Sequence, residues 1–403
     1  MTMARKVPKR ANWLDALRVA SFRAIFIAHV ISLSGTLVAQ VALSVRIHER
    51  TGSSLLSALT FALGLLPHAL AGALSSRCRL PARRTLIGCE LLAGALIAGM
   101  AVPDLPVVML LAATFLAGTF GSLFAVTRAA TLPDLVPPAL YPLAHSILRI
   151  SSNTAQVASY AFGGLLLTKW SSGTILFIDA ATFLLSAIIL YCGLPVAEMP
   201  AGAARRPAAS PAIPRGLWVA LRKPELRALL LLGWLLPVLC VVPEALAIPY
   251  ARGMNGTGWD IGVLLAALPA GSVVGEFWAG RALGERARIA AILPLGLMQL
   301  VPLLVYGMAP VVPIAAAALF VSGLGAGHRL GLDQRILEWS DPQTRGPVLA
   351  LATAGLMLSQ GAAFAAAGAL GDSFAPHRVV AGSAIVGIPC ALLLMMASRS
   401  SRF

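Results

Sequence analysis

The sequence predicts an all-α integral membrane protein in which twelve transmembrane helices form two pseudo-symmetric halves of six. Three observations predict this fold class: an apolar composition, a series of twelve long apolar segments and an internal repeat. Of the 403 residues, 58% are hydrophobic and only 12% are charged, with a mean hydropathy of +0.84. Because soluble domains carry about 25% charged residues, this composition excludes an ordinary water-soluble fold.

The apolar segments follow one another along the whole chain, and each is near the roughly 20 residues that a helix needs to cross a bilayer. The predicted spans cover residues 22–47, 54–75, 85–103, 105–127, 144–168, 172–194, 227–250, 260–280, 289–309, 311–328, 348–371 and 376–397. The first segment is longer than the apolar part of a signal peptide. We therefore expect it to remain in the chain as the first span.

The basic residues predict the orientation in the membrane. With both termini in the cytoplasm, only five of the 31 Lys and Arg residues fall in outside segments: Arg46, Arg50, Lys169, Arg252 and Arg378. The opposite orientation would reverse this bias and violate the positive-inside rule. We therefore expect a multi-pass protein of the cell inner (cytoplasmic) membrane with cytoplasmic N- and C-termini. The net charge of +15 arises from these loops and indicates no nucleic-acid partner.

An internal repeat divides the spans into two sets. Several residues recur at an offset between 204 and 207: Arg23 with Arg227, Arg128 with Arg335, Asp134 with Asp341, Gln156 with Gln360, and Gly164 with Gly368. Since six spans per copy keep the same orientation, the repeat predicts parallel halves and alternating access. The predicted organisation is a cytoplasmic tail at 1–21, an N-terminal half at 22–194, a cytoplasmic linker at 195–226, a C-terminal half at 227–397 and a C-terminal tail at 398–403.

Several short motifs along the chain resemble one transporter family. They are Phe22-Arg23 at the start of the first span, Thr51-Gly52-Ser53 before the second, RAATLPDL at 128–135, and Pro243-Glu244-Ala245 in the seventh. These motifs are similar to the drug-efflux branch of the major facilitator superfamily, which includes macrolide and siderophore exporters and many actinobacterial permeases. The resemblance implies the major facilitator fold and an antiporter that exports small molecules across the cell membrane.

Two motifs depart from the family pattern. Ser76 stands where the loop after the second span usually has an aspartate, and the fifth span reads SYAFGG at 159–164, without the Gly-Pro of the antiporter motif. The resemblance implies that the first of these loops helps to latch the halves together on the cytoplasmic side. The gating-loop candidates are Gly72, Arg77, Arg83, Arg84, Arg128, Asp134, Arg335 and Asp341. We expect the last four to lie in equivalent loops and to pair across helix ends.

Acidic residues within the spans are candidates for proton coupling or cation recognition, because an ionisable group in hydrocarbon costs at least about 2.5–3.5 kcal/mol. Glu90 and Glu276 lie near cytoplasmic helix ends. For these two residues we expect ion pairs with the nearby Arg83, Arg84 and Arg281.

Two further acids lie deeper in their spans. Asp179 is in the sixth span, where we expect a structural role. Glu244 is in the seventh span between Pro243 and Pro249, and the resemblance places this span at the central cavity. Because helix breaks are tolerated where they line a cavity, Glu244 is the leading candidate for coupling. The alternatives are a carboxyl group capped by a neighbouring helix or one that reaches the outer surface.

Two polar stripes run along predicted helices, with members three or four residues apart and so on one face. The stripe of the first span consists of His29, Ser32, Thr36 and Gln40. The stripe of the fifth span consists of Arg149, Asn153, Gln156 and Tyr160. Both stripes, with Gln360, are candidates to line a translocation path, or they form hydrogen bonds between helices. His29 is also a candidate proton carrier.

Other chemistry is not indicated by the sequence. It contains no G-x-x-x-x-G-K-[ST] motif for ATP, and its five scattered cysteines predict neither a disulfide nor a metal site. We therefore expect a monomeric, non-enzymatic secondary transporter without a cofactor, which uses the proton gradient to export hydrophobic or amphipathic small molecules such as drugs or secondary metabolites. Two alternatives remain open: an uptake permease for a small metabolite, and a non-transporting membrane receptor or assembly partner.

Overall fold

The computed structural model describes residues 13–77, 81–138, 140–195 and 212–398. Within these ranges the chain forms helices joined by short connections and contains no strand. The all-α prediction is therefore confirmed. Much of the predicted tails and linker lies outside the described residues.

The helices of the first half run from the short surface helix α1 to α7. They are α1 (Trp13–Arg18), α2 (Ala20–Thr51), α3 (Ser54–Arg77), α4 (Ala82–Met100), α5 (Val107–Leu135), α6 (Tyr141–Leu167) and α7 (Ser172–Gly193).

The second half begins with a short helix in the linker and continues to α17. Its helices are α8 (Ala212–Arg222), α9 (Pro224–Ala245), α10 (Ala247–Gly253), α11 (Gly258–Ala282), α12 (Glu285–Ala290), α13 (Ile292–Leu300), the 3₁₀ helix η2 (Val301–Met308), α14 (Val312–Leu324), the 3₁₀ turn η3 (Gly325–Gly327), α15 (His328–Glu338), α16 (Arg345–Ser373) and α17 (Pro376–Ala397).

Each predicted span corresponds to one helical passage, but two passages continue well past their predicted ends. Helix α5 continues to Leu135, and α15 extends the passage of α14 to Glu338. Arg128, Asp134 and Arg335 therefore lie on helices, and their predicted placement in loops is wrong. The physical reason is that hydropathy reports only the apolar part of a helix, whereas backbone hydrogen bonding continues into water.

Passages in the second half are interrupted where the sequence weakens helical hydrogen bonding. Helices α9 and α10 meet at Leu246, between Pro243 and Pro249, and proline removes a backbone donor. The passage of α14 and α15 changes to a 3₁₀ turn at Gly325–Gly327, where glycine disfavours a regular helix. The prolines on either side of Glu244 predict the first interruption, but the sequence did not indicate the 3₁₀ turn.

Eight described helical passages are long and apolar enough to cross a membrane by length and composition. They are those of α2, α5, α7, α9–α10, α11, α14–α15, α16 and α17. Two shorter apolar stretches cover Ser54–Ala69 and Ile292–Met308. Helices α4 and α6 complete the twelve passages of the fold, and both carry charged or polar residues within their length.

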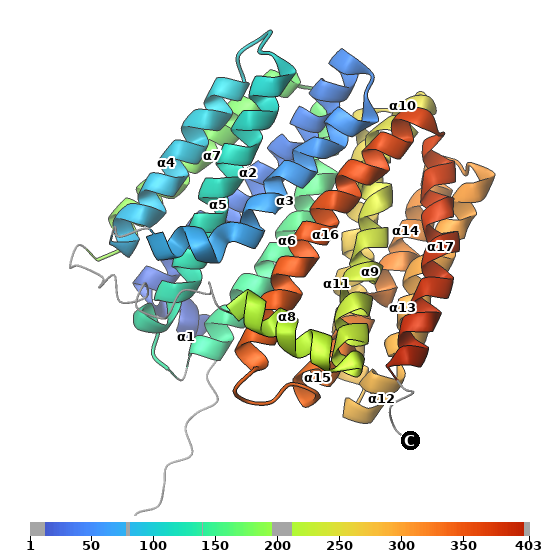
Figure 1. Cartoon of the computed structure of the whole chain (residues 1–403). Coiled ribbons are helices and arrows are strands. Elements are labelled where there is room, and N and C mark those ends of the chain that lie inside the picture. The colour runs from blue at the N-terminus through green and yellow to red at the C-terminus, as the bar shows by residue number, and fades with distance from the viewer. Residues whose placement is uncertain (1–12, 78–80, 139, 196–211, 399–403) are drawn as a thin grey trace, which may run out of the picture.

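The two halves stand side by side, with the first half in blue to green and the second in yellow to red (Figure 1). Helix α16 packs on α3 and α11 packs on α6, so two seams join the halves. Helices α1, α8, α12 and α15 lie at the same end of the bundle as the described C-terminus, which we call the terminal end (Figure 1). The opposite end, where α10 lies, is called the far end.

Close backbone packing joins the halves toward the far end. At the seam of α6 and α11, Gly164 lies against the backbone of Gly258 and Gly262, with no room for a side chain. At the seam of α3 and α16, Gly368 lies against the backbone of Ser54. Glycine is required at both seams because the helix backbones touch there.

Polar contacts reinforce this far-end closure. The carboxylate of Asp372, at the end of α16, accepts hydrogen bonds from Ser53 Oγ and from the backbone N–H of Ser54, which begins α3. Arg252 of α10 donates to Glu49 of α2. Charged side chains of the second half therefore bind near the end of α2 and at the start of α3 in the first half.

Candidate functional site

A polar cavity lies between the halves and is called the central cavity. It has a volume of about 290 Å³ and is lined by residues of α6, α9, α11, α13, α15 and α16. Its polar lining includes Asn153, Gln156, Glu244, Glu276, Arg329 and Gln360. Because both halves contribute to it, a ligand bound here would contact the two bodies that alternating access moves.

Glu244 is joined to the opposite half by a hydrogen bond. It lies at the end of α9, one residue before the break at Ala245–Leu246, and its Oε1 accepts from Tyr160 Oη at 2.7 Å. Tyr160 is only 2% exposed. The bond therefore connects α6 to α9 beside the central cavity, which Glu244 lines.

Glu276 lies between two arginines at the central cavity. Its carboxylate oxygens are 3.7 Å from Arg149 Nη2 of α6 and 3.6 Å from Arg329 Nη1 of α15. The predicted ion pair between Glu276 and Arg281 is therefore wrong. Residues five apart on a helix are rotated by about 140°, so Arg281 faces away from Glu276. The ion pair with Arg149 crosses between the halves, and that arginine is 61% exposed.

The stripe of the fifth span faces the second half. Asn153 and Gln156 line the central cavity, whereas Arg149 reaches Glu276 and Tyr160 reaches Glu244. The stripe therefore combines cavity lining with contacts across the α6–α11 and α6–α9 interfaces.

A second cavity lies within the first half and is called the N-half cavity. It has a volume of about 340 Å³ and is enclosed by α2, α3, α4, α5 and α7. The polar stripe of α2 lines it, with His29, Ser32, Thr36 and Gln40. The remaining lining is mainly apolar, as in sites for drug-sized ligands.

Some polar groups of the N-half cavity also form hydrogen bonds, either to a neighbouring helix or within α2. His29 Nε2 and Ser152 Oγ of α6 are 3.0 Å apart. Thr36 Oγ1 donates to the carbonyl of Ser32 at 2.8 Å, and Gln40 Nε2 donates to the carbonyl of Thr60 at 3.5 Å. The stripe therefore lines this cavity and also forms hydrogen bonds between helices.

Glu90 and Arg128 bring opposite charges to the N-half cavity. Glu90 is 2% exposed, and its Oε1 accepts from Ser32 Oγ at 3.3 Å. The guanidinium of Arg128 lies 5.9 Å from the ring centroid of Phe124. Within the described part of the chain, Glu90 Oε2 and Arg128 Nη1 are buried without a hydrogen-bond partner. A ligand head that both donates and accepts would satisfy these two atoms.

The predicted pairing of Glu90 with Arg83 and Arg84 is wrong. Two turns of α4, about 10 Å, separate Arg83 from Glu90. Arg83 instead donates to the carbonyl of Tyr191 at 2.7 Å, with its guanidinium 4.8 Å from that ring. Arg84 is exposed near the start of α4. Both arginines therefore lie outside the cavity that contains Glu90.

Asp179 lies in a tight contact between α7 and α2. The Asp179 side chain is 2% exposed and packs directly on Gly35. Its Oδ1 accepts a hydrogen bond from Thr182 Oγ1 at 2.9 Å. A side chain at Gly35 would occupy the position of the Asp179 carboxyl group. The contact leaves no space for a ligand at this acid.

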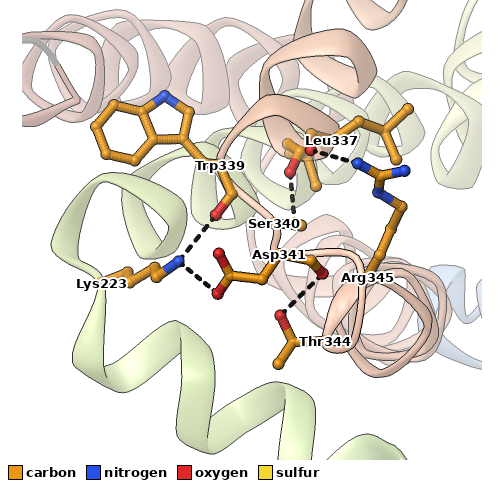
Figure 2. A network of polar contacts seen from close by, with 8 residues as sticks. Lys223, Leu337, Trp339, Ser340, Asp341, Thr344 and Arg345 are labelled. Atoms are coloured by element: carbon orange, nitrogen blue, oxygen red, sulfur yellow. Dashed lines mark hydrogen bonds and ion pairs between the residues drawn. The ribbon is translucent and has the colours of Figure 1, made fainter.

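The remaining gating candidates do not form the predicted pairs. Arg335 lies 3.9 Å from Glu338 in its own helix, and Asp341 accepts from Lys223 Nζ at 3.0 Å (Figure 2). Asp134 is exposed in the last turn of α5. The surroundings of Gly72 and the side chain of Arg77 lie outside what the structure describes. Pairing of the arginines and aspartates across equivalent helix ends is therefore wrong for this conformation.

Sequence reasoning missed two residues that complete the central cavity. Arg329 directly follows the predicted span at 311–328, so the sequence predicts it in a cytoplasmic loop. Gln299 lies within a predicted span, is 1% exposed and lines the cavity. A polar residue within an apolar span is the signal that could have identified Gln299, by the same argument that identified the acids.

A sequence model of the Major Facilitator Superfamily matches residues 25–328 of this chain. The chain is also similar to the uncharacterized MFS-type transporter YfiS of Bacillus subtilis (strain 168). The two are 29% identical over 154 residues. That alignment spans 36% of this chain and 36% of the relative's length.

Solved transporter structures share the fold. The crystal structure of the peptide transporter POT in complex with sulfate has a TM-score of 0.70 at 13% identity, covering 96% of this chain and 95% of that chain. The nucleoside transporter NupG has a TM-score of 0.71 at 10% identity, covering 94% and 99%. A bacterial homologue of the lysosomal transporter Spinster, in an inward-facing conformation, has a TM-score of 0.64 at 14% identity, covering 94% and 96%. At these identities the similarity extends to the fold alone.

Proposed function

Because the chain belongs to the major facilitator superfamily, we propose that it is a secondary active transporter that exports hydrophobic or amphipathic small molecules in exchange for protons. The observation that carries this proposal is the hydrogen bond from Tyr160 to Glu244 across the two halves. It joins a protonatable group to the interface that must open and close.

The bond provides a physical link between proton and substrate. A charge-assisted hydrogen bond is roughly twice as strong as a neutral one, so ionised Glu244 holds Tyr160 more strongly than protonated Glu244 does. The ionised, empty transporter stays closed at the far end. A substrate that takes over one partner of this bond releases the halves, and protonation of Glu244, which weakens the same bond, releases them as well. Substrate and proton then occupy the site alternately, which is the requirement for antiport.

The lining of the two cavities supports an amphipathic substrate. The N-half cavity is mainly apolar with a few charged or polar groups, including Glu90 and Arg128, and the central cavity is polar. A molecule with an apolar body and a polar head matches the pair of cavities. Ionic and hydrogen-bonding groups in such sites set orientation, whereas the apolar lining supplies most of the affinity.

The distribution of basic residues supports the proposed orientation in the membrane. With the terminal end in the cytoplasm of the inner membrane, the far-end contacts lie on the outer side. We propose that the chain works as a monomer in the bilayer and that the proton gradient is its energy source.

Glu244→Gln tests this proposal. The variant would be expressed in efflux-deficient bacteria, and the accumulation of a panel of lipophilic dyes and antibiotics would be measured with and without a protonophore. We expect the wild type to lower accumulation in a protonophore-sensitive way and Glu244→Gln to lose this effect. Glu285→Gln, at an exposed position of α12, is the matched control and should export normally. Normal proton-driven export by Glu244→Gln would overturn the coupling role.

A specific observation favours a second candidate, an uptake permease for a small polar metabolite. The central cavity is lined by amide, carboxylate and guanidinium groups, and the fold resembles peptide and nucleoside transporters. Increased accumulation in the same assay would favour uptake. No flux with confirmed membrane expression would favour a receptor or assembly partner.

A further inference from the structure

Helix α8 is an amphipathic helix in the linker and lies across the terminal ends of α16 and α9 (Figure 1). Its inner face is apolar: Ala220 is buried, and Val219 packs on the core of the second half. Its outer face is also apolar, since Leu217, Trp218 and Leu221 are 48%, 56% and 57% exposed. Three adjacent large apolar side chains are therefore uncovered on one short helix.

Basic side chains surround this uncovered face. Arg215, Arg222 and Arg227 are exposed, and the guanidinium of Arg222 lies 3.2 Å from the ring centroid of Trp218. Apolar and aromatic residues flanked by arginines are typical of helices that lie in the headgroup region of a membrane. This combination of side chains matches a lipid leaflet in which apolar acyl chains lie beneath negatively charged headgroups.

The height of α8 relative to the membrane is fixed by its connections. A single residue, Lys223, separates α8 from the membrane-spanning helix α9. Its Nζ lies 3.0 Å from Asp341 Oδ2 and 3.3 Å from the carbonyl of Trp339 (Figure 2). These contacts tie the end of α8 to the junction of α15 and α16. The helix is thus held at the level where the spans leave the bilayer.

We propose that α8 is an interfacial helix that binds anionic phospholipids in the leaflet at the terminal end. Leu217, Trp218 and Leu221 enter the boundary between headgroups and acyl chains, and the arginines contact the headgroup phosphates. The proposal requires the membrane location of the chain and does not depend on the transport reaction. Juxtamembrane arginines attract anionic lipid at about 1 kcal/mol each, which corresponds to about a five-fold preference.

Quenching of Trp218 by brominated lipid tests this proposal. The full-length protein would be placed in nanodiscs of phosphatidylcholine containing an equal mole fraction of either brominated phosphatidylcholine or brominated phosphatidylglycerol. Since the chain has seven tryptophans, the signal of Trp218 is the difference between wild type and Trp218→Phe. The ratio of quenching in the two lipids measures headgroup preference and is insensitive to the intrinsic brightness of the ring.

We expect Trp218 to be quenched in both lipids and more strongly by the anionic one. Arg215→Gln should lower this preference by up to about five-fold, with quenching by phosphatidylcholine retained. The matched control is Arg378→Gln, an exposed arginine at the far end, which should leave the preference unchanged. A Trp218 signal that neither brominated lipid quenches would show that α8 lies outside the membrane. Equal quenching by the two lipids, or an unchanged preference in Arg215→Gln, would show that the arginines select no anionic headgroup.

Discussion

Gly164→Ala is expected to force the halves apart at the far end. A Cβ atom at Gly164 would lie 2.5 Å from the carbonyl oxygen of Gly258 and 2.5 Å from the Cα of Gly262. Real Cβ atoms essentially never come closer than 3.0 Å to such atoms, so at least about 0.5 Å is missing. Because both neighbouring atoms are backbone, no side chain can rotate to make room. The only relief is separation of α6 from α11.

The cost of this clash falls on one conformation. Overpacking by a methyl group costs about 1–3 kcal/mol in a close-packed site. A conformation in which the halves separate at the far end does not contain the contact and is not penalised. The population ratio of the two conformations should therefore change by about 5- to 150-fold in favour of the far-end-open state.

Electron–electron distance measurements in nanodiscs would detect this change. Spin labels would be placed at Val102 and Phe374, which are exposed at the far end of opposite halves, in a chain whose five cysteines are replaced. Gly163→Ala is the matched control, because a Cβ atom there meets only Val38, at an ordinary 3.5 Å. We expect a longer distance to gain population in Gly164→Ala alone. An unchanged distribution, or an equal shift in Gly163→Ala, would refute the reasoning.

Three further predictions concern the polar contacts between and within the halves. Tyr160→Phe and Glu244→Gln should be non-additive in thermal stability, with a coupling of about 0.6–1.7 kcal/mol; additive effects in a double-mutant cycle would contradict the bond. Asp372→Ala removes the acceptor at the start of α3 and should cost about 0.5–2 kcal/mol, measured by thermal unfolding. Asp104→Ala, an exposed ion-pair partner, should stay within about 0.5 kcal/mol. Glu276→Gln leaves its two arginine partners without a counter-ion, so the difference in thermal stability between this variant and the wild type should shrink as salt is added. A difference that does not change with salt would show that the effect is not Coulombic.

The number and order of the membrane passages could be predicted from the sequence because hydropathy measures the transfer of side chains into hydrocarbon. The ends of passages could not be predicted in the same way. Helix α5 continues past the apolar segment to Asp134 and Leu135, since polar residues can extend a helix into water. Arg128 was therefore misplaced into a loop, although it lines the N-half cavity.

The candidate acids lie on the helical passages where the sequence predicts them, but the partners predicted for Glu90 and Glu276 are wrong. Sequence proximity suggested arginines on the same helix for Glu90 and Glu276. In the structure, Glu90 accepts from Ser32 of α2, and Glu276 pairs with Arg149 of α6 and Arg329 of α15. Partners on other helices depend on how the helices pack, and one sequence does not specify that packing.

The repeat gives these contacts a common arrangement. Gln156 and its counterpart Gln360 line the same central cavity, as expected if the axis relating the halves passes through it. Gly164 and its counterpart Gly368 each form a backbone contact between halves, one at the seam of α6 and α11 and one at the seam of α3 and α16. The two seams are thus equivalent in position and in the use of glycine.

The proposed coupling site breaks this symmetry. At the same offset of 204 residues, Tyr160 corresponds to Phe364 and Glu244 corresponds to Gln40. Phe364 stacks on Phe61 with ring centroids 5.3 Å apart, and Gln40 donates to a backbone carbonyl within the first half. One seam therefore carries a protonatable group and its hydroxyl donor, whereas the equivalent position holds a neutral amide and a phenyl ring. Protonation can therefore change the strength of the Tyr160–Glu244 bond but of no contact made by Phe364 and Gln40. The model of coupling through Glu244 thus requires a single proton-sensitive bond between two halves that are otherwise joined in a similar way.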